Sequence, residues 1–370
     1  LPVVDNANRG HKMGNHYADS EAEMGGKTRV GVLGLVHDHV WSQLSILRDM
    51  ENAELVGAAD PNKPLLAKFR ERTGIDNTYT DYEELLDSEQ LDAVLAYGTN
   101  RSTAELVEMA AERGLHVMTE KPMASSLEVA DRMLVAARKA GVILMVNWPI
   151  AWSPPIQHAL NLVRDGAIGR IWQLKWRGGH CGPRALGCSE YFCNWLYDAV
   201  ENGAGALFDY LGYGASLARL FIGRPHQVMA IAGRLVHQDI PVDDNAVVAL
   251  QYPDANAVIE CTWTEAVPDH PPHDLIVYGT EGVLVAGGSN VITRRKGDDD
   301  EQVHQPPALE APRRNSLQYF VHCIRAGEPV EGVCSPENSL DAQQVMDAAR
   351  LSVLTGSHIS LPLVDHLYPM

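Results

Sequence analysis

The 370-residue chain has few cysteines, no long hydrophobic run and no concentration of positive charge. Six cysteines are too few for a disulfide scaffold, so we expect reduced thiols and a cytoplasmic protein. No apolar stretch approaches the ~18–20 residues that span a membrane, and the first residues lack the order of a secretory signal. Lys and Arg number 30 against 48 Asp and Glu, a net charge of −18 that is spread along the chain. Nucleic acid and anionic membranes are therefore poor partners.

The length suffices for two domains of ordinary size. Residues 1–26 show no periodicity, and we expect a disordered leader there. Residues 27–148 alternate short apolar runs with amphipathic stretches, and the apolar runs predict strands at 29–34, 53–59, 91–97, 115–119 and 142–146. Predicted helices lie between them, one opened by a capping box of Ser125 and Glu128 and closed at Gly141. This alternation is typical of an α/β fold with a doubly wound parallel sheet.

After residue 148 the pattern changes, and residues 149–370 are predicted to form a second α/β domain. The expected strands follow one another at 171–177, 227–236, 245–251, 257–264, 274–278 and 291–294, separated by turn sequences. Such a succession favours a meandering, mainly antiparallel sheet with one face in water. Helices are expected at 155–165, 313–326 and 337–355, and residues 294–311 are expected to form a surface loop.

The turn after the first strand reads Gly34-Leu35-Val36-His37-Asp38-His39. A dinucleotide fingerprint has glycine at three places, so that bare backbone can approach a pyrophosphate at a helix N-terminus. Here only Gly34 remains, and Val36 and His39 occupy the other two places. Asp60, at the end of the second strand, is suited to bind the adenosine ribose, although an Asp-Pro pair also forms ordinary turns. An acid without a nearby arginine favours NAD over NADP.

Glu120-Lys121-Pro122 ends a buried strand, where ligands of open α/β sheets bind. The proline makes Lys121 extended and directs its ammonium into the crevice. Beside an oxidised nicotinamide the ammonium would have a lowered pKa, as a proton shuttle requires. The alternative is a solvated lysine. Asp209 and Tyr213 lie four residues apart on one face of a predicted helix, where they could orient a hydroxyl and relay its proton, or serve as a cap and a core tyrosine.

The degenerate glycine turn, the Glu-Lys-Pro strand end and the Gly203-x-Gly205-(x)3-Asp209-(x)3-Tyr213 helix opening together resemble the glucose–fructose oxidoreductase, inositol dehydrogenase and rhizopine catabolism (Gfo/Idh/MocA) family over about residues 27–365. The resemblance implies a Rossmann domain and an α/β domain whose large open sheet buries one face in a homodimer or homotetramer. It implies oxidation or reduction of a sugar or polyol with NAD(P).

By this resemblance Lys121 is the catalytic lysine and Asp209 orients the substrate. Tyr213 stands where many members have histidine, as in the glucose–fructose oxidoreductase branch, and Tyr213 or Lys121 would take the hydroxyl proton. The cofactor would be contacted by residues of the turn and of three strand ends: Gly34, Val36, His37, His39, Asp60, Asn100, Glu120 and Lys121. The segment Gly98-Thr99-Asn100-Arg101 replaces a commoner Thr-Pro-Asn, and the missing glycines put the pyrophosphate position in doubt.

The segment 177–195 is expected to form a loop over the substrate, with Arg177, His180 and Trp195 as contacts. The alternative is that these residues belong only to a surface loop and to the hydrophobic core. Its cysteines and histidine fit no common zinc spacing, so no metal is expected. Three functions stay open: an NAD-dependent sugar or polyol dehydrogenase, an NAD-dependent glycoside hydrolase that oxidises a ring hydroxyl transiently, and a non-catalytic sugar sensor, which the presence of Lys121 disfavours.

Overall fold

The computed structural model describes residues 26–268 and 272–363. Residues 1–25 of the predicted leader lie outside this range. The first sheet is wholly parallel, as predicted, with the order β3-β2-β1-β4-β5-β6. Its strands are β1 (Thr28–Leu33), β2 (Ala53–Ala59), β3 (Thr78–Tyr79), β4 (Ala93–Ala96), β5 (His116–Glu120) and β6 (Leu144–Asn147). The order reverses between β1 and β4, so a crevice opens at their carboxyl ends.

Helices connect these strands as the alternating pattern predicts. They are α1 (Val40–Arg48), α2 (Lys63–Thr73), α3 (Tyr82–Ser88), α4 (Thr103–Glu112) and α5 (Leu127–Ala140). The predicted capping residue of α5 is wrong by one position, because Ser126 and not Ser125 accepts the hydrogen bond from the amide of Val129. Gly141 ends the helix with φ +69°, as expected for a C-terminal glycine.

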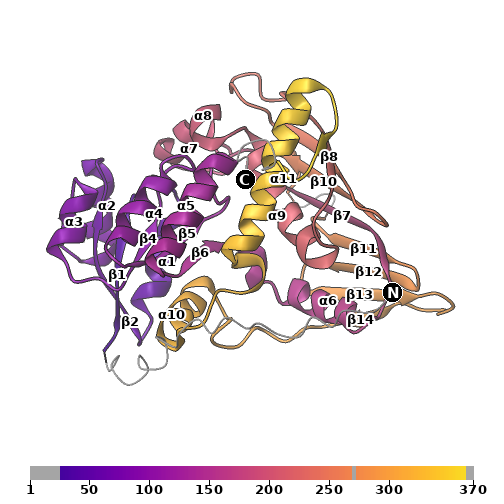
Figure 1. Cartoon of the computed structure of the whole chain (residues 1–370), viewed down its shortest axis with the longest axis horizontal. Helices are drawn as coiled ribbons and strands as arrows, with labels where there is room; N and C mark the ends of the chain where they lie inside the picture. The colour runs from indigo at the N-terminus through magenta and orange to yellow at the C-terminus, as the bar shows by residue number, and fades with distance from the viewer. Residues whose placement is uncertain (1–25, 269–271, 364–370) are drawn as a thin grey trace, which may run out of the picture.

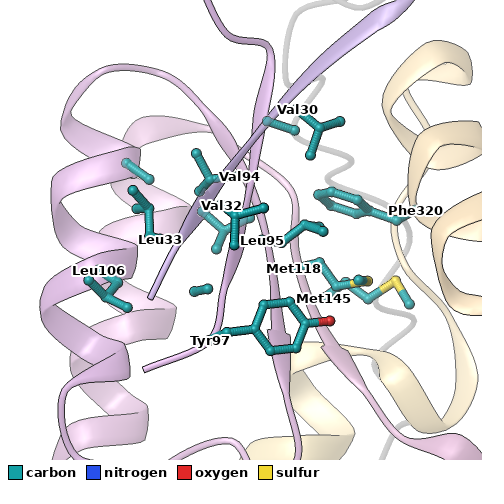
Figure 2. Close-up of a cluster of buried hydrophobic side chains, with 14 of the residues drawn as sticks. Val30, Val32, Leu33, Val94, Leu95, Tyr97, Leu106, Met118, Met145 and Phe320 are labelled. Atoms are coloured by element: carbon teal, nitrogen blue, oxygen red, sulfur yellow. The ribbon is translucent and has the colours of Figure 1, made fainter. Parts of the chain in front are cut away.

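A helix from the C-terminal part of the sequence also packs into the hydrophobic core of the first sheet. In Figure 2, Phe320 of α10 (Ser316–Ala326) faces Met118 and Met145 of the sheet, and all three side chains are buried. One continuous cluster joins the strand residues to α10 and to residues 330–334. The second half of the chain therefore contributes to the hydrophobic core of the first half.

The second sheet has nine strands in the order β14-β13-β12-β11-β7-β10-β9-β8-β15. Their bounds are β7 (Ile171–Gly179), β8 (Gln227–Gly233), β9 (Asn245–Gln251), β10 (Asn256–Thr262), β11 (Leu275–Gly279), β12 (Gly282–Gly287), β13 (Asn290–Arg295), β14 (Gln302–His304) and β15 (Ile359–Ser360). The pairing is antiparallel except between β7 and β10, which are parallel. Strands β12, β14 and β15 were not predicted, and β14 lies within the stretch expected to be loop.

Helices cover one face of the second sheet, and α9 and α11 lie between the two sheets in Figure 1. The long helices are α6 (Pro154–Arg164), α9 (Ala206–Phe221) and α11 (Pro336–Thr355), with short helical segments η1 (Pro149–Trp152) and η2 (Gly332–Cys334). The predicted loop at 177–195 is only partly a loop, because it contains α7 (Glu190–Leu196), which is followed by α8 (Ala199–Asn202). Among residues 26–268 and 272–363, no helix is long and apolar enough to cross a membrane.

Candidate active site

The turn between β1 and α1 keeps a tight shape although two of the three fingerprint glycines are missing. Gly34 has φ +85°, a conformation that favours glycine, and a Cβ there would lie 2.9 Å from backbone atoms of Tyr97 and Gly98. The amide of Gly34 donates to Ala59 O at 2.8 Å. The chain therefore passes close to the end of β4 and delivers the N-terminus of α1 to the crevice, which fits the requirement of a dinucleotide pyrophosphate.

Asp60 holds this turn in place. One carboxylate oxygen accepts the amide of Leu35 at 2.6 Å, and the other accepts the amide and the side-chain nitrogen of Asn62 at 2.7 and 2.9 Å. Its exposed fraction is 0%, and burial raises its pKa despite these bonds. The predicted ribose contact is thus occupied in bracing the turn. Asn62, which is only half-buried, lies beside it at the surface and was not singled out from the sequence.

His37, His39 and Glu120 meet between this turn and the end of β5. Their nearest ligand atoms all lie within 4.8 Å of one another, so they could hold a metal ion. His39 Nδ1 lies 3.0 Å from Glu120 Oε2, while Glu120 Oε1 accepts from Asn147 Nδ2 at 2.7 Å. His37 Nδ1 accepts the amide of His39, and burial, His39 and Lys121 hold its pKa well below the usual range. A metal ion bound here would have to replace the contact between His39 and Glu120 and the bond to His37 Nδ1. That the protein binds no metal stays a prediction.

Helix α7, from the second half of the chain, lies directly on the turn. Asp38 accepts from the hydroxyl and the amide of Ser189 at 2.8 and 2.6 Å. Trp195 Nε1 donates to Val36 O at 3.4 Å, and the rings of Phe192 and Trp195 lie 4.8 and 5.5 Å from that of His37. The structure therefore places Trp195 against the nucleotide turn, in one buried cluster with Trp263, and its contact with a substrate stays a prediction.

Asn100 joins the two halves of the chain. It is buried, and its side-chain nitrogen donates to the side-chain and backbone oxygens of Asn202 at 2.7 and 3.3 Å. Its neighbour Thr99 donates to Glu201 at 2.7 Å. The loop after β4 is thus fixed to α8 through the side-chain nitrogen of Asn100, and the predicted contact of Asn100 with the cofactor stays a prediction.

Lys121 and Asp209 form a buried ion pair at the carboxyl edge of the first sheet. Lys121 Nζ lies 2.5 Å from Asp209 Oδ1 and 3.4 Å from the backbone oxygen of Asp209. The exposed fractions are 7% and 6%. Because Asp209 belongs to the first turn of α9 and Lys121 directly follows β5, the pair spans both halves of the chain.

Both charges of the pair are stabilised by their surroundings. Burial lowers the pKa of Lys121, but Asp209, Tyr213 and Glu120 outweigh burial and raise it above its ordinary value. Burial raises the pKa of Asp209, but Lys121, His180 and the hydrogen bonds from Lys121 and Trp263 bring it below its ordinary value. The lowered lysine pKa that we expect beside an oxidised nicotinamide stays a prediction; among the protein's own groups the nearest charge is a carboxylate, which raises the pKa of Lys121.

Trp263 is a member of this group that the sequence did not reveal. Its exposed fraction is 0%, and its Nε1 donates to Asp209 Oδ2 at 2.8 Å. It follows the last residue of β10, 54 positions after Asp209, and its amide donates to Asp244 O at 2.8 Å. Only a long-range contact identifies Trp263. In the sequence it is one of seven tryptophans, and it stands near the end of an apolar strand.

His180 lies on the other side of the carboxylate, at the end of β7. Its Nε2 is 3.7 Å from Asp209 Oδ2, and its ring is parallel to that of Trp263, with an angle of 2° between the planes. From the sequence we expect His180 near the substrate. In the structure it lies next to the Lys121–Asp209 pair. Burial lowers the pKa of His180, Asp209 raises it and Lys121 lowers it, with a net shift below the ordinary value.

Tyr213 faces Lys121 from the same side of α9 as Asp209. The ammonium lies 5.1 Å from the centre of its ring, which stacks on Trp176 at 5.7 Å and meets the edge of Trp148 at 5.2 Å. Burial, partly offset by Lys121, raises the pKa of Tyr213 to about 12. The phenol is therefore protonated at neutral pH and is a weak candidate for the base.

Arg177 has its charge satisfied within the protein. Its guanidinium lies 2.6 Å from Glu265 and 3.5 Å from Glu260, and Glu265 also meets His273 Nε2 at 2.6 Å. Burial raises the pKa of Glu265, but hydrogen bonds from His273 and Arg177 and their charges bring it below its ordinary value. The arginine is therefore engaged with carboxylates of the sheet, which lessens its value as a contact for an anionic substrate.

Two family descriptions match most of the described chain. Residues 28–148 match the oxidoreductase family with an NAD-binding Rossmann fold, and residues 156–285 match the GFO/IDH/MocA C-terminal domain. The D-apiose dehydrogenase of Paraburkholderia graminis is 29% identical to this chain, with 89% of this chain and 87% of that protein covered. The myo-inositol 2-dehydrogenase of Thermotoga maritima is 25% identical, with coverages of 81% and 89%.

Solved structures of low sequence identity share the fold. An oxidoreductase from Agrobacterium radiobacter, solved with NAD+, L-tartaric acid and magnesium, superposes with a TM-score of 0.78 at 20% identity and covers 90% of this chain and 98% of its own. The aldose–aldose oxidoreductase of Caulobacter crescentus, solved with glycerol, gives 0.75 at 22% identity, with coverages of 90% and 100%.

Proposed function

The chain belongs to the Gfo/Idh/MocA family of oxidoreductases with an NAD-binding Rossmann domain, and we propose that it interconverts a hydroxyl and a carbonyl group of a neutral sugar or polyol. The two relatives named above are a D-apiose dehydrogenase and a myo-inositol 2-dehydrogenase. They give no support to the redox glycosidase or the sugar sensor. NAD is the cofactor, and the acid at the end of β2 keeps NADP the less favoured choice.

The observation that carries the proposal is the buried Lys121–Asp209 pair, 2.5 Å apart at the carboxyl edge of the parallel sheet. A buried ion pair adds little to stability on average, so a pair placed where ligands of such sheets bind is better explained by chemistry. Trp263 and His180 surround the same carboxylate. We assign the proton transfer to Lys121 and the orientation of the substrate to Asp209.

The cofactor would be held by the turn and by the end of β5. The turn residues Gly34, Val36, His37 and His39 would surround the pyrophosphate, and Glu120 with Lys121 would face the nicotinamide riboside. When bound, NAD accepts or supplies hydride at its nicotinamide ring. Asp60 acts through the turn, whose amide of Leu35 it binds. Helix α7 contacts the turn through Ser189 and Trp195 and would limit the access of water to a bound pyrophosphate.

A neutral substrate is favoured by the local charges. Arg177 is neutralised by Glu265 and Glu260, and Arg184 lies within 3.7 Å of Glu190 and 3.5 Å of Asp239. Neither guanidinium is left without a carboxylate. Hydroxyl groups would instead meet the polar tips of His180 and Tyr213, while the aromatic faces near them suit the C–H faces of a sugar.

A second copy of the chain is the partner that suits the uncovered face of the nine-stranded sheet. Met229, Ile231 and Val247 are 51, 72 and 49% exposed, and Ile231 and Val247 are paired directly on neighbouring strands. We propose a homodimer or homotetramer through this face. Light scattering on Ile231→Arg should show a smaller assembly, whereas the exposed Leu354→Arg should not change the assembly; an unchanged mass for Ile231→Arg contradicts the proposal.

A cytoplasmic location is also proposed, because all six cysteines are free and suit a reducing compartment.

The function is tested with purified protein and a panel of free sugars, polyols and chromogenic glycosides, with NAD or NADP. NADH formation from a sugar or polyol, abolished in Lys121→Met but kept in Lys139→Met on the exposed surface of α5, supports the proposal. Release of the chromogenic group without accumulation of NADH supports the redox glycosidase instead. Full activity of Lys121→Met removes the assigned catalytic role.

A further inference from the structure

The groups around Asp209 are almost all hydrogen-bond donors. Asp209 Oδ1 accepts a hydrogen bond from the ammonium of Lys121 at 2.5 Å, and Oδ2 accepts one from the indole N–H of Trp263 at 2.8 Å. His180 Nε2 approaches Oδ2 at 3.7 Å. The carboxylate of Asp209 is the hydrogen-bond acceptor among these residues, and both of its oxygens already accept a hydrogen bond. A substrate oxygen that enters between Lys121 and His180 therefore meets donors.

The backbone fixes which nitrogen of His180 carries the proton. The amide of Gly182 donates to His180 Nδ1 at 2.9 Å, so Nδ1 must offer a lone pair and the neutral ring carries its proton on Nε2. The amide of His180 donates to Thr262 O, and its carbonyl accepts from Glu265, which holds the residue in the sheet. The nitrogen that faces Asp209 is thus an N–H donor, and His180 cannot act as a base there without losing the bond from Gly182.

We infer that His180 Nε2–H is a hydrogen-bond donor to the reacting oxygen of the substrate, beside Lys121 as the group that exchanges the proton. The inference rests on the proposed function and adds a second side chain that contacts the reacting oxygen. Donors placed where negative charge develops on oxygen stabilise that charge, and in a water-poor site their effect is large.

The chemical balance is simple. The carbonyl carbon takes a hydride, with its two electrons, from the reduced nicotinamide, which becomes NAD+. The former C=O π pair moves onto oxygen, and oxygen takes a proton from the ammonium of Lys121. Lys121 becomes a neutral amine and regains its proton from solvent. Asp209, held by Trp263, keeps its charge throughout and favours the return of that proton.

The reverse reaction needs a base that this arrangement keeps scarce at neutral pH. Lys121 is held in its ammonium form and the phenol of Tyr213 keeps its proton. The titratable groups that face Lys121 from the packed elements are Glu120 beside it, Asp209, Tyr210 and Tyr213 of α9, His180 of β7 and His37 of the turn. Alcohol oxidation should therefore speed up with rising pH, about tenfold per pH unit, while reduction stays level between about pH 6 and pH 9.

The tautomer is tested first, because this measurement needs neither substrate nor cofactor. In protein labelled with 15N-histidine, long-range NMR spectra of the wild type and of His180→Gln identify the two ring nitrogens of His180. We expect Nε2 protonated and Nδ1 unprotonated at neutral pH. A ring protonated on Nδ1 overturns the inference, whatever the fate of the proposed function.

The kinetic test uses the alcohol and the corresponding ketone that prove most active in the sugar panel. His180→Gln, which keeps an N–H donor, should retain reduction within about threefold, whereas His180→Leu should lower kcat for reduction about 100-fold. The control His322→Leu, on the exposed side of α10, should leave both unchanged. Alcohol oxidation that is independent of pH near neutrality, or equal rates in the Gln and Leu variants, overturns the inference. Absence of any turnover would instead contradict the proposed function.

Discussion

The two ends of the crevice are built in different ways. The nucleotide turn consists of backbone: a left-handed Gly34, an amide of Leu35 bonded to Asp60, and the N-terminus of α1. The proposed reaction centre consists of side chains, with Lys121, His180 and Trp263 directly after β5, β7 and β10, and Asp209 in helix α9. A backbone turn tolerates changes of side chain, and it keeps its shape here with Val36 and His39 in place of glycine. A cluster of buried charges tolerates no change of side chain without a loss of stability or activity.

The largest expected effect is at the reaction centre. Lys121→Met removes the group to which we assign the proton transfer, so kcat should fall about 10²–10⁴-fold. It also leaves the carboxylate of Asp209 buried without its cation, which should lower the free energy of unfolding by about 3–5 kcal/mol. Steady-state kinetics and urea unfolding measure the two effects. The double variant Lys121→Met/Asp209→Asn should recover stability but not activity; a double variant no more stable than the single one contradicts the charge argument.

The pH dependence of stability follows from the same pair. The pKa of Asp209 is lowered in the folded protein, so its contribution is present above the ordinary value of about 4 and is lost as the pH falls further. The pKa of Lys121 is raised, so its contribution is present below about 10.5 and is lost as the pH rises through the folded value. Urea unfolding across this range should show both limbs in the wild type and neither contribution in the double variant.

Trp263→Phe keeps the ring but removes the N–H that holds Asp209. We expect kcat to fall about 10–100-fold through misplacement of the carboxylate and stability to fall by about 1.5–3 kcal/mol. The apparent pKa that controls alcohol oxidation should also shift, because the carboxylate that raises the pKa of Lys121 is freed. The control is Trp172→Phe, whose indole N–H bonds Gly279 O on the outer surface. Equal behaviour of the two variants would leave Trp263 with a packing role alone.

The same contrast explains what the sequence could and could not predict. The bounds of β2 and β9 are predicted without error, because each strand is set by its own apolar pattern and by turn residues next to it. Strand β12 was missed because glycines at both of its ends resemble turns. Lys121 and Asp209, which the structure pairs, could be singled out from the sequence because each belongs to a short motif. Trp263 belongs to none, and its role exists only because the second sheet brings residues 209 and 263 together.

At the nucleotide turn the expected effect is smaller and specific to cofactor binding. Gly34→Ala forces a Cβ against the backbone of Tyr97 and Gly98 and should raise the Kd for NAD about tenfold. Gly114→Ala is the matched control, since its φ of +72° carries a similar cost of about 1–2 kcal/mol in open space. Calorimetric titration with NAD should separate the two, and an equal Kd in both would show that the turn adds nothing beyond general stability.

The smallest effect is expected at the contact between Asp38 of the nucleotide turn and Ser189, the N-cap of α7. Asp38→Asn weakens the two bonds that hold α7 on the turn, and charge-assisted bonds of this kind are about twice as strong as neutral ones. If α7 covers the bound cofactor, NAD should dissociate about 3–10-fold faster while its association rate stays near that of the wild type, as stopped-flow displacement would show. Ser42→Ala, which removes a bond within the turn that does not reach α7, should leave the dissociation rate unchanged. Equal dissociation rates for Asp38→Asn and the wild type would show that the contact between Asp38 and Ser189 does not control release of the cofactor.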